Sequence, residues 1–251
     1  MSVTTVNKYP IFLGDVHGNW ECLSQFAHRL DGQLNNIAVV QVGDFGMYPQ
    51  LIKNWKPFPF PVYTIRGNHE DHRWLQSIVS KHPAHSTIEI APNLFYVIDG
   101  TVIDFIDPET NNKTRCGFLG GASSVDQTYN PGWQPEEAVS EDAINTLGFA
   151  SENVPLDILV AHSPPDHVIN ETVGHLNLTY WNLPHDWVDK SAQRVAFAWG
   201  MLGSARMVCG HLHVSYTAYY DWSPTGAIHK PAHRICHVLN IDEFRDIKIH
   251  Y

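Results

Sequence analysis

The chain has 251 residues, of which 43% are hydrophobic, and a formal net charge of −10 at pH 7. This length and composition suit one large domain over residues 1–251, and the acidic balance argues against broad electrostatic binding to nucleic acid. No apolar run approaches the roughly 20 residues needed to span a bilayer. Residues 1–8 show no signal-peptide pattern and the four cysteines have no paired spacing, so we expect reduced thiols and a cytoplasmic protein.

Five apolar runs read as buried strands, and each ends abruptly in polar side chains. In chain order the runs are Tyr9–Leu13, Ile37–Val42, Pro61–Ile65, Ile158–Ala161 and Ala205–Cys209. Open α/β sheets keep their sites at the carboxyl ends of the strands, so we expect the residues that follow these runs to meet. The metal-capable side chains at these ends are Asp15, His17, Asp44, Asn68, His69, His162, His211 and His213. This ordered set predicts an active site.

The spacing of apolar residues elsewhere predicts helices between the strands. These helices cover Trp20–Leu30, Glu70–Lys81, 141–147 and 192–199. Asn19 and Ser140 are the expected N-caps of the first and third helix, because Asn and Ser side chains accept hydrogen bonds from the first free backbone N–H groups.

The hydrophobic period changes after the third strand. Further strands are predicted over Leu94–Ile98, Thr101–Ile106, Cys116–Leu119, Tyr216–Tyr220 and Ile235–Ile241. With Asp99-Gly100 as a turn, the first three should form an antiparallel stretch that adds to a second sheet. Long irregular segments are expected at 48–61, with one helical turn, and at 163–187, and such segments are usually functional or mobile.

The side chains at the strand ends have the chemistry of a metal site. Asp15 and His17 are two residues apart, so they project to one side of an extended segment. Mixed carboxylate and imidazole ligands suit manganese, iron, zinc or nickel. Eight candidate groups are too many for one ion but suit two ions that share a bridging carboxylate. Two such ions can clamp a phosphate and generate hydroxide near neutral pH.

The five strand ends resemble the motifs of the calcineurin-like metallophosphoesterase superfamily, from Ile11 to about Val214. Here the motifs are Gly14-Asp15-Val16-His17-Gly18-Asn19, Gly43-Asp44, Gly67-Asn68-His69-Glu70, Ala161-His162 and Gly210-His211-Leu212-His213. The resemblance implies an α/β fold, a four-layer αββα sandwich with two mixed sheets. It also implies a two-metal-dependent phosphoesterase that hydrolyses a phosphomonoester or phosphodiester, with nucleotide-type esters among the candidates, by attack of a metal-bridging hydroxide.

The resemblance also assigns roles to single residues. It places one ion on Asp15, His17 and His213, and the other on Asn68, His162 and His211. Asp44 would bridge the two ions, for which manganese is the first expectation and iron, zinc or nickel the alternatives. His69 would be catalytic and not a ligand, because this histidine stabilises the phosphoryl group or protonates the leaving oxygen in the family.

Arg66 and Asn19 are the candidate substrate-binding residues. Arg66 precedes Gly67 as in the Ser/Thr protein phosphatase branch and could contact phosphate bidentately, although Arg73 and Arg115 are equal candidates. The Asp-Arg-Gly that this branch places after its second aspartate is absent, since Asp44 is followed by Phe-Gly-Met. The final Gly-His-x-His is that of the phosphodiesterase-like branches.

The sequence allows two interpretations of Gly120-Gly121 and two of several aromatic residues, one functional and one structural in each case. Residues 120–126 and 133–137 are similar to small bacterial and phage members, and Gly120-Gly121 is read as a tight turn or as a phosphate-binding backbone. Some aromatic side chains could stack a nucleobase or an aryl group, or could belong to the core. They are Tyr48, Tyr129, Trp133, Trp181 and Trp187.

Other functions compete with a general phosphoesterase. A Ser/Thr protein phosphatase-like enzyme or a dinucleoside polyphosphate hydrolase would use the same centre. A non-catalytic scaffold of this fold would typically have lost ligands or His69, and nothing is missing here. A DNA-processing nuclease would need a basic face, which this acidic chain lacks. We therefore expect a small-molecule phosphoester substrate and neither a membrane nor a nucleic-acid partner. The oligomeric state stays open.

Overall fold

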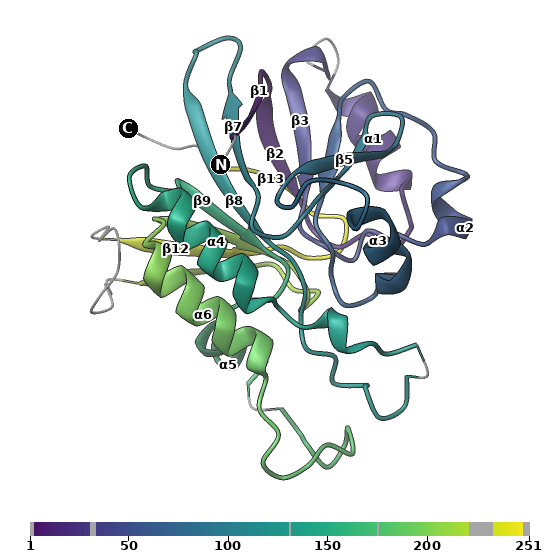
Figure 1. The fold of residues 1–251 in the computed structure, drawn as a ribbon, viewed down its shortest axis with the longest axis vertical. Coiled ribbons are helices and arrows are strands. Elements are labelled where there is room, and N and C mark those ends of the chain that lie inside the picture. The colour runs from purple at the N-terminus through teal and green to yellow at the C-terminus, as the bar shows by residue number, and fades with distance from the viewer. Residues whose placement is uncertain (1–2, 31–33, 131, 175, 221–232, 248–251) are drawn as a thin grey trace.

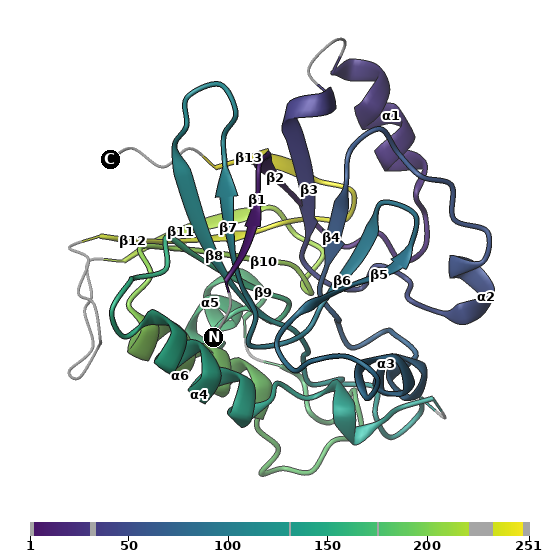
Figure 2. The same cartoon turned by 45° about the horizontal axis from the view of Figure 1, so that its top comes forward.

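The computed structural model describes residues 3–30, 34–130, 132–174, 176–220 and 233–247. It shows two β-sheets packed face to face, with helices on the outer side of each (Figures 1 and 2). Within these residues one sheet has six strands and the other has seven. Both sheets mix parallel and antiparallel pairs, so the predicted α/β fold with two mixed sheets is confirmed.

The six-stranded sheet holds the first three of the predicted strand ends. Its order is β13 (Phe244–Asp246), β2 (Tyr9–Leu13), β3 (Ile37–Gln41), β4 (Val62–Thr64), β6 (Leu94–Val97) and β5 (Thr87–Ala91). The four inner strands run parallel, and the two edge strands are antiparallel to their neighbours. The carboxyl ends of β2, β3 and β4 therefore lie at one edge of this sheet.

The seven-stranded sheet holds the other two strand ends. Its order is β1 (Thr4–Val6), β7 (Val102–Ile106), β8 (Lys113–Leu119), β9 (Ile158–Ala161), β10 (Arg206–Cys209), β12 (Arg234–Val238) and β11 (Tyr216–Tyr220). The strands β8, β9, β10 and β12 are parallel, while the pairs β7–β8 and β11–β12 are antiparallel. Parallel β9 and β10 thus deliver their carboxyl ends side by side.

The helices lie outside the two sheets. On the six-stranded side they are α1 (Glu21–Arg29), α2 (Pro49–Ile52) and α3 (His72–Val79). On the seven-stranded side they are α4 (Glu141–Ser151), α5 (Asp166–Thr172) and α6 (Lys190–Leu202). In Figure 1, α4 and α6 run next to each other across their sheet, and the two helices are in contact. In the described part of the chain, no helix combines the length and apolar character required to cross a membrane.

Three hydrophobic clusters separate the four layers of this sandwich. Val40 and Val160 belong to the cluster between the two sheets. Val39 belongs to the cluster between the six-stranded sheet and α1. Leu159 packs with Trp199 of α6 on the opposite side of the molecule. Successive strand residues point to opposite faces, so each inner strand contributes apolar side chains to two layers at once.

Several predictions of local structure hold. The five strands with polar ends lie within one or two residues of the predicted bounds. Ser140 caps α4, because its hydroxyl accepts a hydrogen bond from Ala143 N–H at 3.4 Å. The expected helical turn after Tyr48 is α2. Asn19, however, is not the cap of α1, since the cap position is Trp20 and its side chain makes no capping bond. The prediction that Asn19 caps this helix is therefore wrong.

Two other predictions are wrong for a reason that local sequence does not contain. The strand at Leu94–Val97 pairs in parallel with β4, so it belongs to the six-stranded sheet and not to the second one. Asp99-Gly100 forms the predicted turn, since Thr101 N–H donates to Ile98 O at 3.1 Å, but this turn leads from one sheet to the other: Ile98 N–H donates to Ser86 O, whereas Gly100 N–H donates to Phe118 O. The segment 163–187 is also not wholly irregular, because it contains α5. The short strands β1, β5 and β13 were not predicted.

Candidate metal centre

The candidate metal centre lies where the carboxyl ends of β2, β3 and β4 meet those of β9 and β10. Backbone hydrogen bonds tie the loops at this point together. His17 N–H donates to Asp44 O at 2.8 Å, which joins the turns after β2 and β3. Gly210 N–H donates to His162 O at 3.1 Å, which joins the turns after β10 and β9. The side chains in these turns are therefore held by the sheets themselves.

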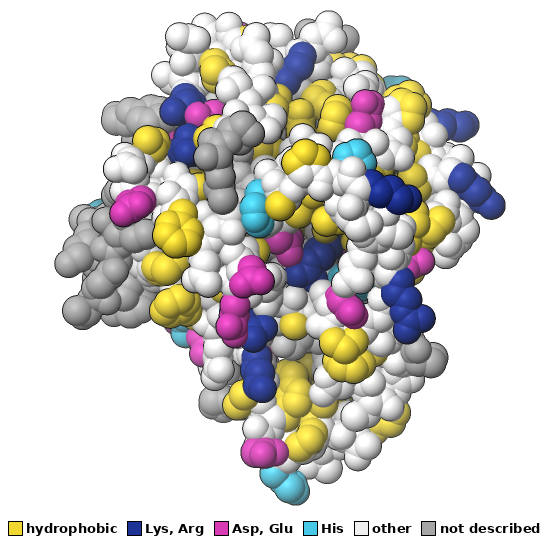
Figure 3. Space-filling view, in the orientation of Figure 1, with side chains coloured by type: hydrophobic (Ala, Val, Ile, Leu, Met, Phe, Trp, Pro, Cys, Tyr) yellow, Lys and Arg dark blue, Asp and Glu magenta, His cyan; other side chains and the backbone are white. Residues whose placement is uncertain are grey.

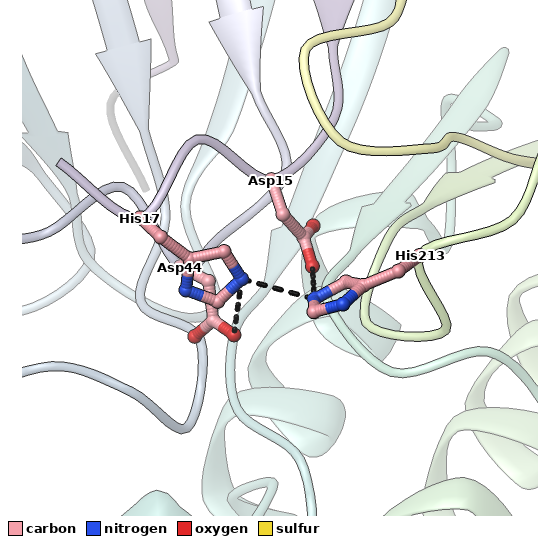
Figure 4. A group of neighbouring side chains, drawn as sticks. All are labelled: Asp15, His17, Asp44 and His213. Atoms are coloured by element: carbon pink, nitrogen blue, oxygen red, sulfur yellow. Dashed lines mark hydrogen bonds and ion pairs between the residues drawn. The ribbon is translucent and has the colours of Figure 1, made fainter. Parts of the chain in front are cut away.

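Four of the predicted side chains form one tight cluster, which Figure 4 shows. They are Asp15, His17, Asp44 and His213, and one ligand atom from each lies within 4.8 Å of the others. His17 Nε2 is 2.9 Å from His213 Nε2 and 3.9 Å from Asp44 Oδ2. His213 Nε2 is 3.3 Å from Asp15 Oδ2. These are the residues that the resemblance assigns to the first ion, together with the expected bridge.

The second predicted group, Asn68, His162 and His211, also adjoins Asp44. His162 Nε2 lies 3.0 Å from Asn68 Oδ1 and 3.5 Å from Asp44 Oδ2. The rings of His162 and His211 are 5.1 Å apart. His162 Nδ1 is 2.9 Å from Val42 O, and since a carbonyl only accepts, Nδ1 carries the proton of this bond. The Nε2 atom therefore faces the cluster, the arrangement by which proteins orient a metal-binding histidine.

The surroundings of Asp44 indicate whether a cation fits between the two ligand groups. Its side chain is 1% exposed, yet Oδ2 accepts no hydrogen bond from the described chain. A buried carboxylate oxygen without a partner costs roughly 1–3 kcal/mol, and more for a charged group. Bound cations would compensate this cost. The surrounding donors are carboxylate, imidazole and amide groups, a set that suits divalent transition metals. The residues present therefore fit the implied ions.

The protonation of the histidines matches this conclusion. Burial lowers the pKa of His211 to about 3, with His162 adding to the effect, so the His211 imidazole is neutral at pH 7. Burial also opposes a charge on His162, but the carboxylates of Asp44 and Asp15 outweigh it and raise its pKa to about 9. In the metal-free protein a proton on His162 thus partly neutralises Asp44. A cation bound between them would displace that proton.

Backbone strain concentrates in the same turns. His17, Asp44, His211 and His213 have φ angles of 46°, 54°, 70° and 53°. This left-handed region disfavours side chains with a Cβ atom, and such strain persists only where the surrounding structure imposes it. Because four candidate ligands adopt this conformation, we infer that the turns hold these side chains in the orientation that brings them together.

Two glycines allow the loops to approach the carboxylates. A Cβ atom on Gly67 would lie 2.0 Å from Asp44 Oδ1, and one on Gly210 would lie 2.0 Å from Asp15 Oδ1. Neither position accepts a side chain without displacing a candidate ligand. The glycines in these motifs are thus required by the close packing of backbone against carboxylate.

His69 lies at the exposed rim of the cluster. Its backbone N–H donates to Asp44 Oδ1 at 2.8 Å, and its ring centroid is 5.7 Å from that of His17. The side chain is exposed, in contrast to the buried Asn68 and Glu70 on either side. The imidazole can therefore meet a substrate placed over the cluster.

Buried hydrogen bonds that involve Ser124 and Glu137 support Asn68. The sequence alone indicated no role for Ser124 or Glu137. Asn68 Nδ2 donates to Ser124 Oγ at 3.1 Å, and Ser124 Oγ donates to Glu137 Oε2. Ser124 and Glu137 are each 3% exposed. Because Ser124 fixes the amide nitrogen, Asn68 Oδ1 must face His162. Ser124 and Glu137 lie in residues 120–126 and 133–137, the two segments similar to small bacterial and phage members of the superfamily. That similarity was the sequence signal that could have pointed to them.

Glu70 supports the loop after Asp44 in a similar way. Its carboxylate accepts hydrogen bonds from the N–H groups of Phe45, at 2.8 Å, and of Met47. Burial, reinforced by the negative charge of Asp44, raises the pKa of Glu70 to about 8. Glu70 belongs to the motif Gly67-Asn68-His69-Glu70, but the motif did not indicate that its side chain would bind the loop after Asp44.

The candidate substrate-binding arginine is engaged elsewhere. Arg66 is buried, and its Nε and Nη2 contact Asp99 Oδ2 at 2.8 and 2.7 Å. Its Nη1 and Nη2 also donate to backbone carbonyls of residues 136–138. The five N–H donors of the guanidinium are thus used within the protein, which argues against a phosphate contact. Arg115 is likewise paired, with Asp104.

Gly120-Gly121 and Asn19, two other candidates for substrate contact, differ in whether their polar groups are engaged within the protein. Gly120 N–H donates to Asp99 Oδ1, and Gly121 N–H donates to Arg66 O, both at 2.9 Å, so both amides already have partners within the protein. Asn19 is exposed in the turn after β2, and its backbone N–H donates to Val16 O. A substrate contact by the Asn19 side chain stays a prediction.

The chain is similar to one known protein family and to several solved structures. The family model described as calcineurin-like phosphoesterase matches residues 11–215. No curated protein is similar enough in sequence to count as a relative. The solved structures similar to this chain include the following two. Phosphopantetheinyl hydrolase from Mycobacterium tuberculosis has a TM-score of 0.44 at 13% identity, covering 94% of this chain and 92% of that one. The 5′-nucleotidase from Candida albicans SC5314 has a TM-score of 0.43 at 12% identity, covering 96% of this chain and 47% of that one. The family match spans most of the chain and all the clustered motifs, so the protein belongs to the calcineurin-like phosphoesterase family and is a metal-dependent phosphoester hydrolase.

Proposed function

We propose that the protein hydrolyses a phosphomonoester or phosphodiester, of which nucleotide-type esters are one candidate, with two divalent ions, and that manganese serves in both positions. Asp15, His17 and His213 would hold one ion, and Asn68, His162 and His211 the other. The observation that carries this proposal is the position of Asp44 Oδ2. This oxygen, which accepts no hydrogen bond from the described residues, lies 3.9 Å from His17 Nε2 and 3.5 Å from His162 Nε2, so one carboxylate adjoins both ligand groups.

The chemistry divides between the ions and the chain. When bound, a pair of divalent ions polarises the phosphoryl group and lowers the pKa of a coordinated water. The chain fixes the ligand side chains through the strand ends and keeps the His211 imidazole neutral. The exposed imidazole of His69 would donate a proton to the leaving oxygen or hold the phosphoryl group, and its anchored backbone N–H places it beside Asp44.

The proposal is tested by metal content and by His69→Ala. Elemental analysis of protein loaded with manganese should give two ions per chain, and His69→Ala should retain both because His69 is not a ligand. Turnover of an alkyl phosphate, a poor leaving group, should fall by roughly 10²–10⁴-fold, the usual contribution of a general acid. A nitrophenyl ester should lose distinctly less, since nitrophenolate leaves without a proton.

A matched control is His82→Ala, which removes an exposed histidine just beyond α3. This variant should retain the metal content and both rates of the parent. Equal losses on the two esters in His69→Ala would remove the general-acid role and leave phosphoryl positioning. One ion or none in the fully loaded parent protein would overturn the two-metal proposal itself.

A further inference from the structure

A large cavity opens beside the candidate metal centre. Its volume is about 860 Å³, and its wall includes Asn68, His69 and His211 where it meets the cluster. Ligand sites typically occupy roughly 300–1,000 Å³, so the cavity is large enough for an organic molecule. A phosphoester whose phosphate lies at the metal centre would therefore place its remaining part here.

Much of the cavity wall is apolar and uncovered. It includes Ile169 of α5 and, from the segment between α5 and α6, Leu176, Trp181 and Trp187. Leu176 is 39% exposed, and the neighbouring wall residue Val173 is 52% exposed. Figure 3 shows hydrophobic side chains at the surface in the lower part of the molecule, where the loop leading into α6 lies in Figure 1. Covering such side chains is favourable, at roughly 25 cal/mol per Å² of apolar surface.

The charge of the wall is negative beyond the metal centre. Asp126, Asp166 and Asp189 line the cavity, and no lysine or arginine is among its described lining residues. Asp166 and Asp189 each accept a hydrogen bond from a backbone N–H group, and burial raises the pKa of Asp189. An additional anionic group on a substrate would face these carboxylates without a compensating cation.

We propose that this cavity selects phosphoesters whose non-phosphate part is apolar and either uncharged or cationic, and rejects substrates with a second anionic group. This inference rests on the proposed phosphoesterase function and specifies its substrate class. Trp181 and Trp187 would pack against the apolar part, and a cationic group would be stabilised by the carboxylates and by the aromatic faces. A dinucleoside polyphosphate fits poorly, because its further phosphates would enter the acidic cavity.

The test uses three aryl phosphates that differ in charge at one position. They carry an aminomethyl, a hydroxymethyl or a carboxylate group para to the ester oxygen. With manganese-loaded protein, we expect kcat/KM for the cationic and neutral esters to exceed that for the anionic ester by at least about tenfold. The corresponding phenols, which lack phosphate, should bind the metal-free protein in the same order by calorimetry.

Two reference esters separate this inference from the function on which it rests. If neither 4-nitrophenyl phosphate nor bis(4-nitrophenyl) phosphate is hydrolysed, the proposed function fails and the inference falls with it. If either is hydrolysed while the anionic aryl ester is used as well as the cationic one, only the inference is overturned.

Variants assign the selection to the cavity wall. Asp126→Lys should reduce the preference for the cationic over the anionic ester by at least about tenfold, whereas Glu152→Lys, the same charge change at the exposed end of α4, should not. Trp181→Ala should lower kcat/KM for all three esters by about tenfold or more. Its control is Phe197→Ala, which removes a 64% exposed aromatic ring outside the cavity. Unchanged selectivity in Asp126→Lys together with unchanged rates in Trp181→Ala would overturn the assignment.

Discussion

Ser124→Ala should weaken one metal ion selectively. The hydroxyl of Ser124 accepts from Asn68 Nδ2 at 3.1 Å and donates to the buried carboxylate of Glu137. Without it, the Asn68 amide loses the contact that keeps Oδ1 directed toward His162. Removal of a group that orients a ligand typically costs about 10–100-fold in metal affinity. At about 1.4 kcal/mol per tenfold, this corresponds to roughly 1.4–2.8 kcal/mol.

Calorimetric titration of metal-free protein measures this effect. Only the ion held by Asn68, His162 and His211 should bind more weakly, while the ion at Asp15, His17 and His213 should keep its affinity. The neighbouring Ser123→Ala is the matched control. The Ser123 hydroxyl accepts from Ser191 N–H at 3.3 Å, at the start of α6, and should not influence either ion.

Stability has to be measured alongside metal affinity. The change leaves Asn68 and Glu137 each without one buried hydrogen bond, which costs roughly 1–3 kcal/mol in unfolding free energy. The orienting role of Ser124 would be supported if the metal-free variant has the circular dichroism spectrum of the parent and if titration then shows a lower affinity for one of the two ions. Wild-type affinity for both ions, or an equal loss of both, would refute the idea that Ser124 orients Asn68.

Three more predictions follow from the site and the fold. Asp44→Asn should lower the content of both ions more than any other single ligand change, as elemental analysis would reveal; full occupancy with full turnover would show that Asp44 is not shared. Gly67→Ala should displace Asp44 and abolish metal binding, because the new Cβ would lie 2.0 Å from Oδ1 and 2.4 Å from the backbone nitrogen. The control Gly148→Ala in α4 adds a methyl group beside the end of a flexible side chain and should fold and bind metal normally. Burial, followed by the charge of Arg245, lowers the pKa of His237 from 6.5 to about 4. The unfolded chain thus binds the extra proton first, and the unfolding free energy should fall as the pH drops from about 6.5 to 4. His237→Gln should flatten this slope in chemical denaturation of the metal-free protein, and an identical slope would contradict the argument.

The positions of the candidate ligands could be predicted because their cause is local. A buried strand such as Ile158–Ala161 needs apolar side chains on both faces, and an imidazole directly after it can only lie at the strand end. The parallel pairing of β9 with β10 then places His162 near His211. Strand period and the place of the first polar residue were sufficient for this inference.

The wrong predictions concern choices that the strand period does not encode. Leu94–Val97 has the pattern of a strand in either sheet, and its pairing with β4 is decided by the path of the chain through Asp99-Gly100. Ser124 and Glu137 likewise show no local sign of their role, since Asn68 is 56 residues away from Ser124 in sequence. Contacts of this kind appear only when the loops after β4 and β8 are packed together.

Arg66 shows how a motif residue can influence the site through contacts within the protein. Its guanidinium joins Asp99 to the carbonyls of residues 136–138, and Asp99 also holds Gly120 N–H. The segment fixed in this way carries Glu137, which holds Ser124 and, through it, the Asn68 amide. Breaking a buried ion pair by removing one partner costs roughly 3–5 kcal/mol, so loss of Arg66 would disturb the second ion through the fold. A lower activity in an Arg66 variant is therefore no sign of a phosphate contact unless metal affinity and stability are unchanged.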